Sequence, residues 1–410
     1  MNRLLERFLK YVSIETTSDP NSNLHPSSLK EFDLINLLEK ELINLGLENI
    51  HKSEKGYLYA KLKANTNKDY FKIGLIAHVD TSSDMSGKNI NTKIIENYDG
   101  KDVLLNECEN IVMSINEFPF LKDLKGRTLI TTDGTTLLGA DDKAGIAEII
   151  ELIEYLNTNP EIEHGDIYIA FTPDEEIGEG TLYFELDKFP CDFAYTVDGG
   201  KEGEINYENF NAASAVVKVK GINIHPGSAK DHMINSILVA MEFNSNLDSN
   251  LLPSKTEMYE GFNHLNNIEG SVEETTMHYI IRNHDKKLFE KQKQDFIDIQ
   301  NDINKKYKKE LISVQINDSY YNMYDIIKDH MEIVNLAIEA TNEANVKAEI
   351  SPIRGGTDGA TLTYKGLNTP NLGTGGFNFH GKYECITLEG MEKVVQILIN
   401  IIRKAKKESF

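Results

Sequence analysis

Acidic and imidazole side chains recur along the chain at points where a short apolar run or a glycine-containing turn ends. They are His78, Asp80, Asp141, Asp142, Glu175, Glu176, Asp198 and His380. Histidine and carboxylate ligands without thiolates are typical of catalytic zinc, cobalt or manganese. Two such ions about 3.5–4 Å apart need one bridging carboxylate, with one histidine and one further acid for each ion. The candidates suffice for such a site. Of the acids left over, Asp80 and one of the two glutamates could orient an imidazole and deprotonate a water.

Each of these groups also has a structural explanation. A lone histidine at the end of a strand is usually a satisfied structural group. The Asp141-Asp142 pair precedes a helical pattern, where acids commonly serve as caps. Adjacent acids such as Glu175 and Glu176 are commonly just solvated. The occurrence of all these groups in one chain favours the metal site, because each follows an apolar or glycine-rich segment and all could meet at one edge of a sheet.

The first half of the chain alternates strand-like and helical patterns, which predicts an α/β domain with a central sheet. The expected strands are residues 72–79, 166–172 and 193–197, and the expected helices are 29–45 and 142–156. Each predicted strand delivers acids or an imidazole where it ends. In open α/β sheets, ligands bind at that edge.

The pattern changes after about residue 211. Strand-like and helical segments then follow in the order β-α-β-α-β, which predicts a small α+β domain with helices on one face of an antiparallel sheet. We expect an inserted domain at residues 211–320, and one discontinuous catalytic domain made of residues 1–210 and 321–410.

Composition restricts the partners and the compartment. The net charge of −22 argues against nucleic acid and anionic membranes, since phosphate binding needs clustered lysines and arginines. No apolar run reaches the roughly 20 residues of a membrane span, and the N-terminus lacks the pattern of a signal peptide. The three cysteines, Cys108, Cys191 and Cys385, are too scattered for a disulfide framework or a thiolate metal site. These features predict a cytoplasmic protein.

Several segments together resemble the M20 metallopeptidases. They are His78-Val79-Asp80, Leu138 to Gly145, Thr172 to Glu176, Thr196 to Gly200, His225-Pro226-Gly227, Pro352 to Gly359 and Phe379 to Lys382. The resemblance covers essentially the whole chain, and the strings around Gly139 and Gly355 are its most specific parts. It implies a zinc-exopeptidase-like catalytic domain of α/β class. It also implies that the inserted α+β domain is ferredoxin-like and serves as a lid or in dimerisation, so that a homodimer could form.

The resemblance also assigns roles to the metal-site residues. It implies two divalent ions, expected to be zinc, with Asp141 as the bridge. His78 and Asp198 complete one metal site, and Glu176 and His380 complete the other. Asp80 orients the imidazole of His78, and Glu175 is the general base. The choice of Asp141 over Asp142, and of Glu175 over Glu176, follows from the resemblance alone. A cis peptide bond between Asp141 and Asp142 is also implied.

Residues that hold the substrate are expected in or near the inserted domain. The family places a histidine there that stabilises the oxyanion, which points to His225. Arg282 and Arg354 could bind a peptide carboxylate through two hydrogen bonds, and Asn235 could also face the site. Surface ion pairs or turn positions are the alternatives for these residues.

The resemblance predicts an aminopeptidase that acts on short peptides, best on tripeptides. The rival enzymes are a dipeptidase and an N-acyl amino acid deacylase, which would share all the metal residues. A metal- or peptide-binding protein without catalysis is the rival of another class.

Overall fold

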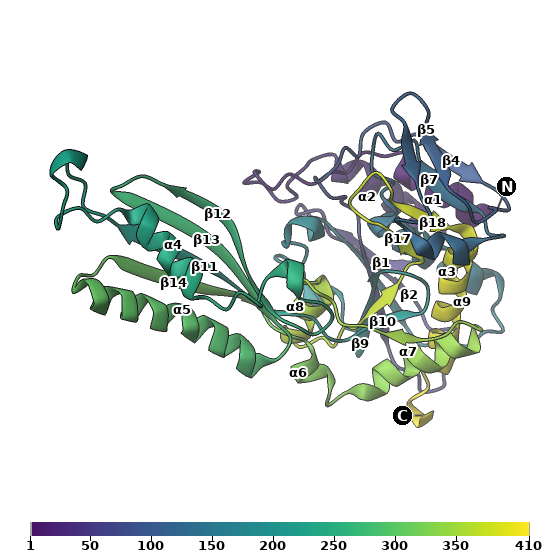
Figure 1. The fold of residues 1–410 in the computed structure, drawn as a ribbon. Helices are drawn as coiled ribbons and strands as arrows, with labels where there is room; N and C mark the ends of the chain where they lie inside the picture. The colour runs from purple at the N-terminus through teal and green to yellow at the C-terminus, as the bar shows by residue number, and fades with distance from the viewer. Residues whose placement is uncertain (1, 410) are drawn as a thin grey trace. The chain divides into compact units, whose positions relative to one another are not determined.

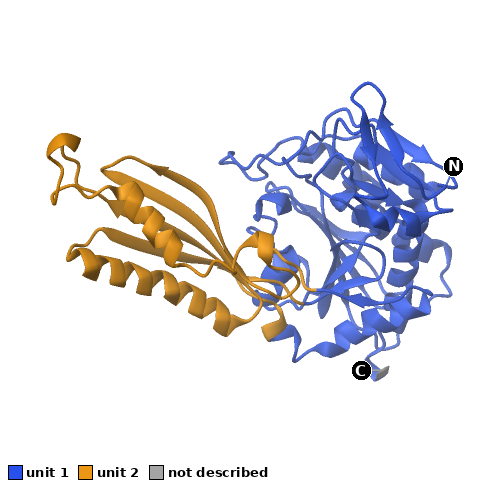
Figure 2. Cartoon of the chain, viewed as in Figure 1, with its two compact units in different colours: residues 1–207, 326–351, 357–410 blue, residues 208–325, 352–356 orange. Residues whose placement is uncertain are grey.

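The structure is a computed structural model that describes residues 2–409 (Figure 1). Two compact units make up the chain (Figure 2). Unit 1 comprises Met1–Tyr207, Ile326–Ser351 and Thr357–Phe410, and unit 2 comprises Glu208–Asp325 and Pro352–Gly356. The chain thus leaves unit 1 after Tyr207, returns to it at Ile326, and later adds one short segment to unit 2.

The helices are α1 (Arg3–Val12), α2 (Glu31–Asn44), α3 (Ala140–Thr158), α4 (Ser236–Asn246), α5 (Lys286–Tyr307), α6 (Tyr324–Ile327), α7 (Met331–Glu343), α8 (Asp358–Tyr364) and α9 (Leu388–Lys404). The short 3-10 helices are η1 (Pro119–Leu124), η2 (Glu175–Ile177), η3 (Leu186–Lys188), η4 (Pro226–Ser228), η5 (Pro253–Lys255) and η6 (Lys407–Ser409). The strands are β1 (Glu48–Lys52), β2 (Leu58–Leu62), β3 (Ile73–His78), β4 (Thr92–Ile95), β5 (Val103–Asn106), β6 (Ile111–Met113), β7 (Leu129–Thr132), β8 (Ile167–Thr172), β9 (Phe193–Gly199), β10 (Glu204–Asn206), β11 (Asn211–Lys220), β12 (Phe262–Gly270), β13 (Glu274–Asn283), β14 (Ile312–Tyr320), β15 (Glu349–Ile350), β16 (Asn371–Gly373), β17 (Gly376–Phe377) and β18 (Cys385–Thr387).

Unit 1 is built on a central sheet with the strand order β1-β2-β8-β3-β9-β16-β10-β15. Its middle is parallel, since β3 pairs in parallel with β8 and β9, and β9 pairs in parallel with β16. All six residues of β3 and all six of β8 are buried. Strands buried on both faces read as continuous apolar runs, which is why the sequence pattern revealed them. The predicted α/β class is confirmed.

Helix α3 covers this sheet and is buried along most of its length. The helix and the sheet approach closely at Gly145, where a Cβ atom would lie 2.0 Å from the carbonyl oxygen of Val197 in β9. Only glycine therefore permits this contact. Helices α1 and α9 pack against α3 in turn. A second sheet of unit 1, with the order β17-β18-β7-β4, carries the segments that flank the start of α3.

Unit 2 is a four-stranded antiparallel sheet with the order β12-β13-β11-β14. Helices α4 and α5 pack on it over a core that includes Phe243, Phe289 and Phe296 (Figure 1). The element order β11-α4-β12-β13-α5-β14 is ferredoxin-like. The predicted order β-α-β-α-β was wrong because it lacked β12. Strand β12 reads Phe-Asn-His-Leu-Asn-Asn-Ile-Glu-Gly and is largely exposed, so the sequence shows little apolar alternation there.

Within residues 2–409, none of the helices is both long enough and apolar enough to span a membrane.

Candidate metal centre

Three neighbouring strands of the central sheet carry candidate ligands where they end. Strand β3 ends at His78, and Asp198 lies near the end of β9. Strand β8 leads into η2, which contains Glu175 and Glu176. Because β3 runs parallel to both β8 and β9, the side chains at these strand ends gather at one edge of the sheet.

The carboxylate of Asp141 lies between the two imidazoles. Its Oδ1 is 2.9 Å from His78 Nε2, and its Oδ2 is 3.0 Å from His380 Nε2. A second carboxylate lies beside each imidazole. Asp198 Oδ1 is 3.4 Å from His78 Nε2. Glu176 Oε2 is 3.0 Å from His380 Nε2. These five residues therefore form two histidine–carboxylate clusters that share Asp141.

The donor atoms fit divalent metal ions. His78, Glu175 and Asp198 each offer one ligand atom within 4.8 Å of the others, and so do His78, Asp141 and Glu176. Glu176 Oε1 is buried and has no hydrogen-bond partner within residues 2–409, although Oε2 contacts His380. A buried polar atom without a partner is costly. A cation in this cluster would satisfy the orphaned oxygen.

Crowded carboxylates dominate the electrostatics of the site. Burial, and the charges of Asp198 and Asp358, raise the pKa of Glu175 well above its ordinary value. Burial and the charge of Asp141 raise the pKa of Glu176 to about 7. Burial also raises the pKa of Asp198 to about 6. Divalent cations would relieve this repulsion and hold the acids ionised.

Asp141 is electrostatically distinct from the other acids. Burial alone would raise its pKa, but hydrogen bonds with His380 and His78 outweigh burial and lower the pKa below the ordinary value. The hydrogen bonds with Asp141 and Glu176 raise the pKa of the His380 imidazole to about 11. Of these acids, Asp141 thus has the surroundings that most favour an ionised carboxylate with one oxygen toward each imidazole.

The neighbouring Asp142 has different surroundings. Its Oδ2 accepts a hydrogen bond from the backbone N–H of His78 at 3.1 Å, and the side chain is fully buried. The Asp141–Asp142 peptide bond is cis, as the resemblance predicted. Of the two acids, Asp141 makes the contacts with both imidazoles.

Asp80 supports two parts of the site. Its carbonyl oxygen lies 3.0 Å from His78 Nδ1, and its Oδ1 lies 3.3 Å from the same nitrogen. Its carboxylate also accepts hydrogen bonds from the backbone N–H groups of Glu175 at 3.0 Å and Glu176 at 3.2 Å. Asp80 therefore contacts the imidazole and also anchors the turn that carries both glutamates.

The sequence reading missed two buried acids near these ligands. Asp358 is almost fully buried and accepts a hydrogen bond from the hydroxyl of Thr172 at 3.3 Å. Burial raises the pKa of Asp358 to about 7. Glu384 is also buried and accepts backbone hydrogen bonds from Leu138, Gly139 and Asp141, at the start of α3. The available signal was a single acid inside a glycine-rich or apolar segment, which alone does not indicate a site.

His225 and Asn235 have local contacts inside unit 2. The Nδ1 atom of His225 accepts a hydrogen bond from the backbone N–H of Gly227 at 3.1 Å, and the side chain is exposed. Asn235 caps α4, because its side chain accepts a hydrogen bond from the N–H of Ile237 at 2.9 Å. Their roles toward substrate stay predictions.

Both predicted arginines also have partners within unit 2. Arg282 donates to the carbonyl oxygen of Ala213 at 3.2 Å. Arg354 donates to the carbonyl oxygens of Met258 at 2.8 Å and Glu260 at 2.9 Å. A substrate carboxylate would have to compete with these contacts, and its binding by either arginine stays a prediction.

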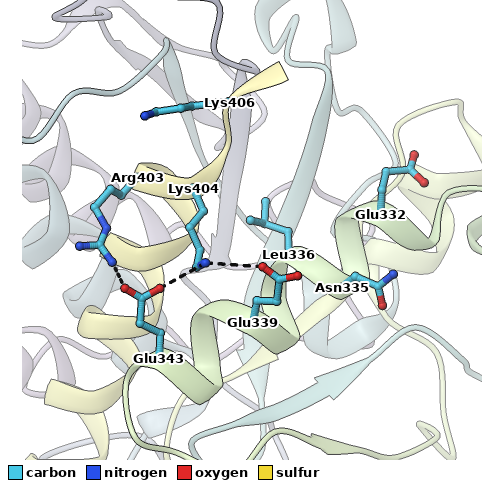
Figure 3. A pocket seen from close by; sticks show the side chains of 8 residues that line it. All are labelled: Glu332, Asn335, Leu336, Glu339, Glu343, Arg403, Lys404 and Lys406. Carbon is cyan, nitrogen blue, oxygen red and sulfur yellow. Dashed lines mark hydrogen bonds and ion pairs between the residues drawn. The ribbon is translucent and has the colours of Figure 1, made fainter. Parts of the chain in front are cut away.

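A pocket of 640 Å³ in unit 1 is lined mainly by charged side chains of α7 and the end of α9 (Figure 3). Arg403 forms an ion pair with Glu343, and Lys404 lies 3.5 Å from Glu339 and 3.3 Å from Glu343. These charges compensate one another, so the pocket has no evident preference for an anion or a cation. None of the described residues that line it is a predicted site residue.

The family model described as Peptidase family M20/M25/M40 matches residues 132–404. The chain belongs to this family. A protein of Caldanaerobacter subterraneus subsp. tengcongensis named "Peptidase T" is 55% identical over 402 residues, which cover 98% of each chain. The predicted membership of the M20 family and the predicted peptidase class are therefore confirmed.

Two solved structures resemble this chain. The aminopeptidase PepT from Bacillus cereus has a TM-score of 0.79 at 22% identity, covering 99% of this chain and 98% of that one. A dinuclear metal binding peptidase of the M20 family from Bacillus subtilis has a TM-score of 0.67 at 15% identity, covering 100% and 98%. At these identities the likeness shows the fold, and the predicted two-domain exopeptidase fold is confirmed.

Proposed function

We propose that this chain is a metal-dependent aminopeptidase that removes the N-terminal residue from short peptides and acts best on tripeptides. One observation carries the proposal: the two oxygens of Asp141 contact different imidazoles, and each imidazole has a second carboxylate beside it. This is the arrangement that a pair of metal ions with one bridging ligand requires. The 55% identity to a protein named "Peptidase T" supports the choice of peptide substrates.

Five residues would hold two divalent ions, which we propose to be zinc. His78 and Asp198 would serve one ion, Glu176 and His380 the other, and Asp141 both. When bound, such ions polarise a carbonyl group and make water a nucleophile at neutral pH. The mixture of imidazole and carboxylate donors is the set that catalytic zinc uses.

Glu175 is the proposed general base. Its buried surroundings raise its pKa, so this carboxyl group can take a proton from water and later return it to the leaving amine. Asp80 keeps the His78 imidazole in place and, through two backbone hydrogen bonds, keeps Glu175 and Glu176 at the turn.

The α-ammonium group and the C-terminal carboxylate of the substrate would each bind to protein groups of opposite charge. The buried acids favour a free α-ammonium group through their field. Arg354 is the proposed partner of the far carboxylate, with His225, Arg282 and Asn235 as further contacts. The proposal also includes a lid or dimerisation role for residues 211–320, a homodimer and a cytoplasmic location.

A peptide series tests the proposed substrate. Tripeptides should be cleaved best, with kcat/KM for dipeptides and pentapeptides lower by at least roughly tenfold, because only one length places both ends correctly. The measurement is kcat/KM for one sequence extended from two to five residues, with each peptide free and N-acetylated.

The N-acetylated peptides are the control for the terminus. Acetylation removes the positive charge and leaves the scissile bond unchanged, so cleavage should be nearly lost. Equal cleavage of free and N-acetylated tripeptides would end the aminopeptidase proposal in favour of a deacylase, and a preference for dipeptides would favour a dipeptidase.

A further inference from the structure

The carboxylate of Glu384 accepts hydrogen bonds from three backbone N–H groups at the start of α3. Oε2 accepts from Leu138 at 2.6 Å and from Gly139 at 2.9 Å, and Oε1 accepts from Asp141 at 3.2 Å. Glu384 is 1% exposed, so water does not compete for these bonds. Consecutive N–H groups that point into one concavity form a typical anion site. Here the chain supplies the anion from its own side chain.

Glu384 is itself held firmly. It immediately precedes β18, whose first residue, Cys385, pairs with Thr131 of β7. The Thr131 hydroxyl donates to the carbonyl oxygen of Glu384 at 3.0 Å. Glu384 also follows His380 by four positions. The same short segment therefore contributes one imidazole and fixes the backbone of the residue whose carboxylate contacts that imidazole.

We propose that Glu384 is a positioning residue that sets the direction of the Asp141 carboxylate between the two metal ions. The inference rests on the proposed metal site. Only two rotatable bonds separate the Asp141 backbone from its carboxylate, so a fixed backbone limits the positions that Oδ1 and Oδ2 can reach. Outer partners of metal ligands commonly change metal affinity by 10–100-fold when they are replaced.

The alternative is that Glu384 only stabilises the fold. The two roles differ in what they predict for metal binding by a folded variant. In Glu384→Gln, an amide NH₂ replaces one oxygen and would face N–H donors instead of accepting from them. A structural role would lower the stability of the apoprotein alone, whereas a positioning role would also weaken the binding of metal.

Glu148→Gln is a matched control. Glu148 is a fully buried glutamate of α3 whose two carboxylate oxygens have no hydrogen-bond partner among the described residues. The same change of chemistry at equal burial therefore leaves the Asp141 segment untouched. Its zinc affinity should equal that of the wild type.

The test is calorimetric titration of apoprotein with Zn²⁺ for the wild type, Glu384→Gln and Glu148→Gln, with melting curves of each apoprotein. We expect Glu384→Gln to bind zinc at least roughly tenfold more weakly. Wild-type affinity in a folded Glu384→Gln would overturn the inference. A wild type that binds no zinc would instead refute the proposed function.

Amide hydrogen exchange in the wild type tests the three backbone hydrogen bonds to Glu384 without relying on a variant. The amides of Leu138, Gly139 and Asp141 should be protected in the apoprotein, since a buried carboxylate accepts all three. Exchange of these amides at the rate of an open loop would overturn the inference, even if Glu384→Gln failed to fold.

Discussion

Replacing Glu175 by glutamine should lower kcat by at least about 100-fold, the usual contribution of a general base, and should leave two metal ions bound. Glutamine keeps the size of the side chain and its place beside Asp198, but it cannot accept a proton from water. The proposed metal ligands stay intact, so the loss should fall on the chemical step and leave KM little changed. The measurement is kcat and KM for a tripeptide, together with metal content per chain.

Two further variants make this result specific. Glu179→Gln changes an acid four residues along the same segment, whose side chain is half-exposed and lies 3.6 Å from His25. It should keep wild-type activity. Glu176→Gln should lose metal, because Glu176 is the proposed ligand beside His380. If Glu175→Gln loses an ion and Glu176→Gln keeps both, the two assignments are reversed.

Removing metal with a chelator should lower peptide cleavage by at least about 1,000-fold, since metal ions contribute several kcal/mol to stabilising the transition state. Zinc or cobalt should restore the activity. The cluster has an excess of closely spaced carboxylates, and burial together with their mutual repulsion raises the pKa values of Glu175, Glu176 and Asp198. The measurement is tripeptide cleavage before chelation, after it, and after each metal is added back.

Cysteine replacement is the control for the ligand set. Burial raises the pKa of the Cys191 and Cys385 thiols, which makes both poor thiolate ligands. Cys108 is exposed. A variant with all three cysteines changed to alanine should therefore bind metal and recover activity as the wild type does. Loss of metal in that variant would contradict a site made of imidazoles and carboxylates.

The positions of the candidate ligands could be predicted because buried parallel strands have a simple signal. Strands β3, β8 and β9 are continuous apolar runs, and polar residues after such runs must lie near one sheet edge. The resemblance to M20 enzymes then distinguished Asp141 from Asp142, which spacing alone could not do. The structure gives these two acids different partners.

Other features left little trace in the sequence. Strand β12 lies at the edge of the unit 2 sheet with most side chains exposed, so it has neither an apolar run nor a clear alternation. Glu384 accepts backbone hydrogen bonds from residues that lie far away in the sequence, and Asp141 is 243 positions from it. A contact between one acid and backbone groups requires no residue type at the partner positions. No motif could therefore reveal it.

Anomalous diffraction from a crystal grown with zinc tests the two-metal site most directly. Data collected at the zinc absorption edge should show two peaks in each chain. One peak should lie against His78 and Asp198, and the other against Glu176 and His380. Each peak should lie about 2.0–2.2 Å from an oxygen of Asp141, which is the usual zinc–oxygen distance. A single peak, or two peaks that do not share Asp141, would contradict the dinuclear site on which the proposed peptidase chemistry depends.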